Sequence, residues 1–262
     1  MSNAALHVAR TGLDAQNTKM RVIANNLANV NTTGFKRDRA DFETLAYQQM
    51  VAAGANSDSQ NKFATGLNLG SGVAMQGTSK INTQGTLQET GNALDMAIEG
   101  SGFFQVQRPD GSIAYTRAGN FSTTAEGTLV TSDGMPLIPQ ITVPQGATGI
   151  TIGNDGTVTA TLQGQSEPTQ LGQVELASFM NPAGLQPIGG NLLAESAASG
   201  TPQVGVAGLD GRGVIRSGSL ETSNVNVVEE LVDMIETQRA YEVNSKMIKA
   251  TDEMLQYVNQ QL

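Results

Sequence analysis

Apolar side chains recur every seven residues at both ends of this chain. The C-terminal repeat runs without a break, and the N-terminal repeat is accompanied by a second row that Gln16 interrupts. A seven-residue apolar repeat is typical of a helix that packs along a narrow seam against another helix. The pattern predicts helices over about residues 3–30 and 226–258, with assembly positions at Leu6, Leu13, Met20, Ile23, Leu27, Val227, Leu231, Met234, Tyr241, Ile248 and Leu255.

Local signals predict where these helices begin and end. The first helix should stop within residues 31–34, where Gly34 suits a left-handed cap. Gly12 is a weak point inside it, costing about 1 kcal/mol relative to alanine. The second helix should start after Asn226, with Glu229 three residues further on in a capping-box arrangement.

The two predicted helices carry opposite charge. Residues 1–40 hold six basic and two acidic side chains, whereas residues 221–262 hold three basic and eight acidic ones. Opposite charge favours pairing of the two helices in a coiled-coil-like domain. The alternative is that the two charged faces are solvated independently.

The second seam row of the C-terminal helix is mostly polar after Leu231. A helix with a half-polar seam forms a weak isolated hairpin, and its narrow stripes are better covered by several neighbouring helices than by one. The pattern therefore favours a building block of a polymer. The alternative is an ordinary two-helix hairpin that rests on the central domain.

The middle of the chain shows the pattern of an antiparallel β domain. Alternating residues around Phe104 and Val106 are followed by Asp110-Gly111 and by a second alternating run with Ile113 and Tyr115. Asp-Gly between two such runs is a strong hairpin signal. Similar turns punctuate the rest of the region and predict short strands at 129–132, 149–152, 157–162, 173–179 and 213–216.

The predicted fold class is α+β: two long terminal helices, a central antiparallel β domain and an extended Gly-rich segment. Residues 51–80 are small and polar with many glycines, so they cannot bury much apolar surface and their composition favours a flexible linker. The predicted boundaries are 1–34 for the N-terminal helix, 35–80 for the extended segment, 81–220 for the β domain and 221–262 for the C-terminal helix.

Composition argues against most chemistry. Cysteine is absent and His7 is the single histidine, so neither a thiol nucleophile nor a usual His/Cys metal site is available. No phosphate-binding loop, dinucleotide fingerprint or serine elbow is present. The net charge of −9 disfavours nucleic acid. No apolar run is long enough to span a membrane or to form a signal peptide. We expect no enzyme activity, no cofactor and no membrane insertion.

Two terminal segments resemble the matching motifs of bacterial flagellar rod, hook and hook-associated proteins. They are residues 23–36 (IANNLANVNTTGFK) and 221–246 (ETSNVNVVEELVDMIETQRAYEVNSK), and residues 94–106 and 114–121 are similar to the first β domain of that family. The resemblance covers essentially the whole chain. The motif positions that it carries are Asn25, Asn26, Leu27, Asn29, Asn31, Gly34, Phe35, Asn224 and Val225.

Within this family, residues 35–48 and 234–241 are most similar to the distal rod type. The resemblance implies a self-assembling, rigid hollow tube that crosses the periplasm and outer membrane and transmits motor torque to the hook. Implied partners are the chain itself, proximal rod proteins, the hook protein, the surrounding ring (bushing) proteins and the flagellar type III export apparatus. A segment resembling the one that distinguishes rod from hook should brace neighbouring subunits through Phe42, Leu45, Tyr47, Gly66 and Gly70.

Two other interpretations stay open. A proximal rod or hook type of the same family is the nearest alternative. A secreted β-rich enzyme acting on cell-wall glycan is more distant, since it would need a carboxylate pair in a cleft at glycosidase separation.

Overall fold

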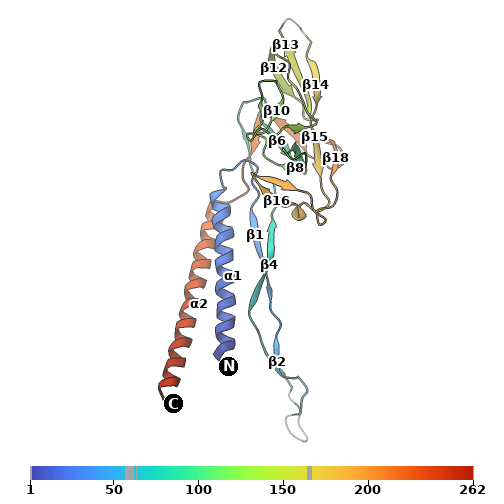
Figure 1. The fold of residues 1–262 in the computed structure, drawn as a ribbon. Coiled ribbons are helices and arrows are strands. Elements are labelled where there is room, and N and C mark those ends of the chain that lie inside the picture. The colour runs from blue at the N-terminus through green and yellow to red at the C-terminus, as the bar shows by residue number, and fades with distance from the viewer. Residues whose placement is uncertain (1, 57–61, 63, 164–166, 262) are drawn as a thin grey trace. The chain divides into compact units, whose positions relative to one another are not determined.

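The chain divides into two compact units (Figure 1). The computed structural model describes residues 2–56, 62, 64–163 and 167–261, without side chains at 2–5, 255 and 258–261. The helical unit comprises Met1–Leu27, Asp38–Ser79 and Val227–Leu262, and the β unit comprises Ala28–Arg37 and Lys80–Asn226. Residues 28–37 pack with the β unit, although the sequence prediction had divided them between the first helix and the extended segment.

Helix α1 (Ser2–Ala28) and helix α2 (Val227–Gln261) form the helical part of the first unit and lie side by side in opposite directions (Figure 1). Helix α1 ends two residues before the predicted boundary at residue 30. Helix α2 begins directly after Asn226, the residue that the capping pattern had placed at its start. With the β unit described below, these helices confirm the predicted α+β class.

The extended segment predicted at 35–80 pairs within itself, and its Gly-rich part at 51–80 pairs with the residues that precede it. Its strands form a β1–β4 pair and a β2–β3 pair, which we call the ribbon; the strands are β1 (Asp38–Thr44), β2 (Gln48–Val51), β3 (Leu67–Leu69) and β4 (Val73–Lys80). The Ser79 hydroxyl donates to the Asp41 carboxylate at 2.7 Å, and this bond is the main cause of the lowered pKa of Asp41. Composition had favoured a flexible linker. Strand partners within the same segment instead satisfy its backbone hydrogen bonds.

The β unit is built around one seven-stranded sheet. Its strands run in the order β16-β17-β8-β7-β15-β18, and β11 also pairs with β7. Their pairings are antiparallel, as predicted. The strands are β7 (Phe103–Gln107), β8 (Ile113–Thr116), β11 (Leu137–Ile138), β15 (Glu175–Ser178), β16 (Gln186–Gly189), β17 (Leu192–Ala194) and β18 (Gln203–Val206).

Smaller sheets complete the β unit. Strands β12, β13 and β14 form a three-stranded sheet, and three further pairs join β5 to β20, β6 to β19 and β9 to β10. A short 3-10 helix, η1 (Pro182–Gly184), lies between β15 and β16. The bounds are β5 (Leu87–Glu89), β6 (Met96–Glu99), β9 (Ser122–Thr123), β10 (Leu129–Val130), β12 (Ala147–Ile152), β13 (Thr157–Leu162), β14 (Thr169–Gln173), β19 (Val214–Ser217) and β20 (Ser219–Glu221).

The hairpin predicted around Asp110 is confirmed. Phe104 and Val106 are fully buried on β7, which pairs with β8 on the other side of the turn. Each of the other five predicted strands overlaps an observed strand, and the one at 157–162 coincides with β13. Turn chemistry and alternation therefore located these strands, although they did not give the sheet order.

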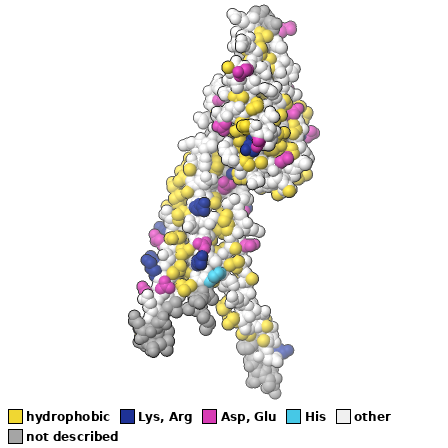
Figure 2. Space-filling view, in the orientation of Figure 1, with side chains coloured by type: hydrophobic (Ala, Val, Ile, Leu, Met, Phe, Trp, Pro, Cys, Tyr) yellow, Lys and Arg dark blue, Asp and Glu magenta, His cyan; other side chains and the backbone are white. Residues whose placement is uncertain are grey.

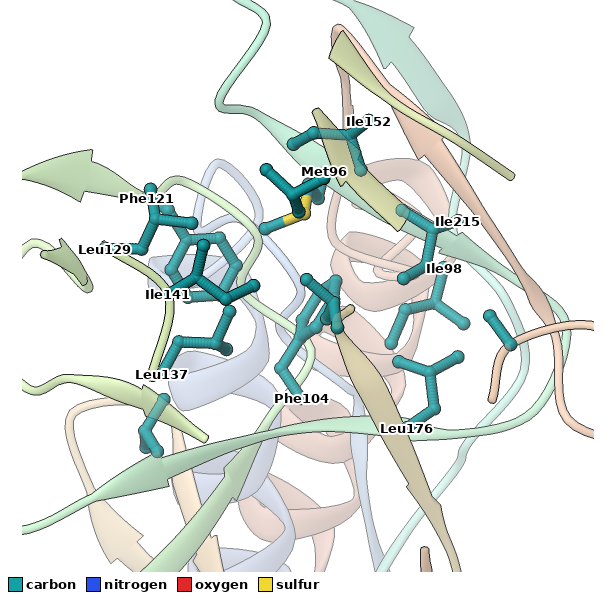
Figure 3. Close-up of a cluster of buried hydrophobic side chains, with 14 of the residues drawn as sticks. Met96, Ile98, Phe104, Phe121, Leu129, Leu137, Ile141, Ile152, Leu176 and Ile215 are labelled. Carbon is teal, nitrogen blue, oxygen red and sulfur yellow. The ribbon is translucent and has the colours of Figure 1, made fainter. Parts of the chain in front are cut away.

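The main core of the β unit gathers aliphatic side chains from several strands around Phe104 (Figure 3). Phe104 meets Phe121 edge to face, with ring centroids 5.2 Å apart. A second cluster lies around Tyr115, whose ring meets Phe179 edge to face at 4.8 Å. Burial of one such side chain contributes about 1.5–3 kcal/mol to the stability of the folded unit. This unit therefore has a hydrophobic core of its own.

Gly34 occupies a backbone position that only glycine fits. Its φ is +67°, and a Cβ added there would lie 2.6–2.7 Å from backbone atoms of Arg117 and Ala118. We expect Gly34→Ala to lower the free energy of unfolding of the β unit by about 3 kcal/mol, because left-handed strain and overpacking add. Gly111→Ala is the matched control, with φ +83° and no atom within 4 Å of the added Cβ. Urea denaturation that gave equal losses for both variants would contradict the close approach.

Candidate assembly surface

A buried polar contact joins the two helices. The Asn26 side chain donates to both carboxylate oxygens of Glu230 at 3.3 Å, and both residues are 1% exposed. The same amide donates to the backbone carbonyl of Asp38 and accepts from its N–H, each at 2.9 Å. One asparagine thus connects α1, α2 and the start of the ribbon. A buried polar group of this kind favours one register of two helices over its neighbours.

A second contact lies further along the helix pair. An added Cβ at Gly12 would lie 3.0 Å from the side-chain nitrogen of Asn244. Gly12 and Asn26 are fourteen positions apart on α1, and their partners Asn244 and Glu230 are fourteen positions apart on α2. Equal spacing on both helices is expected for a continuous antiparallel register. The sequence had marked Gly12 as a weak point. The structure shows that its missing side chain makes room for α2.

Helix α2 turns a largely polar row toward the interior of the helical unit. Glu230 and Thr237 are each 1% exposed, and Asn244 and Thr251 continue the row at seven-residue spacing while remaining partly buried. Seven residues are nearly two full helical turns, so these positions share one face. The sequence prediction did not identify this row, because polar residues at core positions are unusual.

The opposite face of α2 exposes apolar side chains, interspersed with charged ones such as Arg239 and Lys246. Val228 is 69% exposed, Val232 51% and Ile235 50%. A step from residue 230 to residue 232 turns by about 200° around the helix axis, which places these side chains away from the polar row. We define the outer stripe as Val228, Val232, Ile235, Val243, Met254 and Tyr257, all of them exposed. Figure 2 shows hydrophobic side chains gathered on the surface of the helical part.

The predicted seam residues fall into three groups. Ile23 is buried, at 4% exposed. Leu6, Leu13, Met20, Leu27, Met234 and Ile248 are partly buried. Val227, Leu231 and Tyr241 are exposed by 39–43%, and the side chain of Leu255 lies outside the described residues. Within one chain, the predicted apolar row is therefore only partly covered.

The ribbon and α1 line an apolar groove. It has a volume of about 460 Å³ and is bordered by Val8 and Gly12 of α1, Val73 of β4 and Met247 of α2. Further along the ribbon, Tyr47 is 63% exposed and Leu67 51%, while Phe42 and Leu45 are partly buried. Gly70 lies against the Tyr47 ring, and an added Cβ at Gly66 would meet the backbone of Val51 and Ala53.

The β unit contains a buried cluster of three charges. The Glu221 carboxylate accepts from the Lys36 ammonium at 2.6 Å and from the Arg117 guanidinium at 3.2 Å. The exposed fractions are 0% for Glu221, 4% for Lys36 and 7% for Arg117. The backbone N–H of Gly85 also donates to Glu221, and the carbonyls of Thr83, Ile98 and Gly100 accept from the two cations.

Burial sets the electrostatics of this cluster. Burial lowers the pKa of the Lys36 ammonium and of the Arg117 guanidinium, and Glu221 opposes both shifts through hydrogen bonds and charge. Arginine stays charged in proteins, so Glu221 always faces at least one cation. A fully buried and paired carboxylate has no contact with solvent or substrate. The cluster therefore joins Lys36, Arg117 and Glu221 inside the β unit.

The family-motif positions divide between the two units. Asn26 belongs to the helical unit, whereas Gly34, Phe35, Asn224 and Val225 belong to the β unit. Phe35 and Val225 are each 8% exposed, and the Lys80 ammonium lies 5.2 Å from the centroid of the Phe35 ring. The other motif positions are Asn25 and Asn31, both exposed, Leu27, which is partly buried, and Asn29, which bonds Thr32 in the turn after α1.

Within the described residues, no three His, Cys, Asp or Glu side chains lie close enough together to hold a metal ion. None of the described helices combines the length and apolar character needed to cross a membrane.

The described residues thus combine a helix pair, in which α2 exposes a stripe of apolar side chains, with a β unit held together by its own core and a buried charge cluster. Three family descriptions match the sequence: "Flagella basal body rod protein" over residues 6–36, "Flagellar hook protein FlgE/F/G D1 domain" over 97–160 and "Flagellar basal body rod FlgEFG protein C-terminal" over 216–261.

Relatives that align with nearly the whole chain are also flagellar basal-body rod proteins. The chain is 52% identical over 98% of both sequences to a flagellar basal-body rod protein FlgG of Buchnera aphidicola subsp. Acyrthosiphon pisum, and 49% identical to that of Agrobacterium fabrum over 98% of this chain and 99% of that protein. It is 36% identical to a flagellar basal-body rod protein FlgF of Caulobacter vibrioides, over 93% of this chain. The chain belongs to the flagellar basal-body rod protein family.

Proposed function

We propose that this chain is the structural subunit of the flagellar distal rod, a hollow helical tube that transmits motor torque from the proximal rod to the hook. The observation that carries the proposal is the outer stripe of α2. Its six apolar side chains are exposed in the single chain, whereas the face toward α1 is largely polar. Exposed apolar side chains repeated along a helix are a liability in a monomer and favour an interface in an assembly.

In this proposal α1 and α2 pair in a coiled-coil-like domain, and the outer stripe packs on the helical unit of a neighbouring copy. The apolar groove beside Val8, Val73 and Met247 could receive a side chain from that copy. Helices of many copies would then surround the axial channel through which later subunits are exported. The polar inner row explains why a single helix pair is insufficient, since it buries little apolar surface.

The ribbon is proposed to brace neighbouring subunits and to keep the tube straight. Support comes from Tyr47, Met50, Leu67 and Leu69, which are 44–63% exposed on a two-stranded ribbon. A two-stranded ribbon is marginally stable by itself, so these side chains favour cover from a second copy.

The remaining partners follow from family membership. We propose contacts with proximal rod proteins, the hook protein and the surrounding ring proteins, and export by the flagellar type III apparatus. The assembled chain would cross the periplasm and the outer membrane as part of the basal body. A proximal rod or hook type remains the alternative assignment, while a glycan enzyme has no support among the described buried carboxylates.

Electron microscopy of concentrated purified protein tests the proposal. We expect straight tubes whose terminal helices surround a channel. A variant lacking residues 43–72 should give curved or fragile tubes at a similar yield, because the helices are intact and the brace is gone. Curved tubes from the unaltered chain would favour a hook-type subunit. Straight, rigid tubes from the deletion variant would rule out the brace.

A further inference from the structure

The chain crosses between the two units four times, and hydrogen bonds within the β unit join residues next to three of these crossings. The chain passes between units after Leu27, Arg37, Ser79 and Asn226. Residues beside the last three passages, namely Arg37, Ile81 and Asn224, are joined by hydrogen bonds although they lie far apart in the sequence. All three belong to the β unit, so the arrangement is internal to that unit.

The Asn224 side chain is the centre of this arrangement. Its oxygen accepts from the backbone N–H of Arg37 at 2.7 Å. Its nitrogen donates to the carbonyls of Ile81 at 2.8 Å and Thr83 at 3.1 Å, and to the Thr83 hydroxyl at 3.0 Å. One side chain thus binds the segment that leads into the ribbon, the segment that returns from it and the segment that leads into α2.

Backbone bonds connect the same segments without the Asn224 side chain. The N–H of Ile81 donates to the Arg37 carbonyl at 2.8 Å, and the N–H of Gly34 donates to the Glu221 carbonyl at 2.8 Å. These backbone bonds make it possible to distinguish two roles of the Asn224 side chain. If Asn224 bonds each neighbour separately, its loss should free only the groups that it touches. If it holds the segments as one body, the backbone bonds should open with it.

We propose that Asn224 is a latch that keeps these three passages fixed to one another on the β unit. An asparagine suits this position because its amide presents an acceptor on one side and two donors on the other. No aliphatic side chain and no carboxylate offers both. The mechanical meaning of the latch rests on the proposed rod function, since load from ribbon and α2 would enter the β unit at one shared point.

Hydrogen exchange of the full-length, dilute chain, resolved by NMR, tests the latch. Asn224→Ala should speed exchange at the Ile81 and Gly34 amides at least tenfold, together with Arg37, while amides of β7 and β15 keep their protection. Acceleration at Arg37 alone would overturn the proposal, because the bonds would then be independent. An equal acceleration in β7 and β15 would also overturn it, in favour of a general loss of stability.

Two further variants complete the design. Asn181→Ala removes a side chain that donates to the Ala198 carbonyl at 3.0 Å elsewhere in the β unit, and should leave the three amides unchanged. Asn224→Ser retains one hydroxyl and is measured in the same way if Asn224→Ala does not fold. The dilute chain is unassembled, so failure of the latch leaves the proposed assembly untouched, and failure of assembly leaves the exchange result valid.

Discussion

Glu221→Gln is expected to lower the free energy of unfolding of the β unit by about 3–5 kcal/mol. The substitution keeps the shape of the side chain and removes the charge that the Lys36 and Arg117 cations share. Two cations would then remain buried without an anion, and that cost is far larger than the loss of one neutral hydrogen bond. Urea denaturation followed through the NMR signals of Tyr115, the one tyrosine between residues 80 and 226, measures the effect.

Glu99→Gln is the matched control for this prediction. Glu99 accepts from Arg216 at 2.7 Å in the same unit, but the two side chains are 45% and 50% exposed. An exposed pair of this kind contributes less than about 1 kcal/mol because water screens it. If the two variants unfolded at the same urea concentration, the buried cluster would not stabilise the β unit in the way described.

Ile235→Asp is expected to abolish rods in cells, or to require at least about tenfold more subunit for assembly, which corresponds to about 1.4 kcal/mol per contact. Ile235 is 50% exposed in the N-terminal part of the outer stripe, and the proposed assembly buries it against a neighbouring copy. The new carboxylate would have to lose its water there without a partner. Electron microscopy of basal bodies from a bacterium that carries only the variant checks this result.

Gln238→Asp provides the comparison for the stripe. It introduces the same charge at an exposed polar position of the same helix, outside the outer stripe. Circular dichroism of both purified variants should show unchanged helix content, since neither position is buried in the single chain. Normal rods from Ile235→Asp would show that the outer stripe is not an interface between subunits.

The sequence predicted those features that depend on neighbouring residues. Asp110-Gly111 and the alternating runs beside it located the first hairpin, because a turn and its strands are encoded within about a dozen residues. The seven-residue repeats located both helices, with ends within a few residues of the observed ones. The capping-box pattern of Asn226 and Glu229 marked the start of α2, and such a pattern is also local.

Other features escaped prediction because they join distant parts of the chain. Lys36, Arg117 and Glu221 each look like ordinary surface charges in the sequence, and only the fold buries them together. The ribbon was expected to be a flexible linker because glycine and small polar residues bury little surface. Its strands are ordered by pairing, a property that composition does not report.

The helices show most clearly which features the sequence determines and which only the tertiary structure decides. The repeat from Val227 onward determined that α2 is a helix with one apolar row beside a mostly polar one. It did not determine which row faces α1, because an amphipathic pattern specifies that a face is covered and not by what. The contacts of Asn26 with Glu230 and of Gly12 with Asn244 decide that, and they turn the outer stripe toward solvent. Helix formation is local, whereas the choice of face depends on which distant groups can satisfy one another when buried.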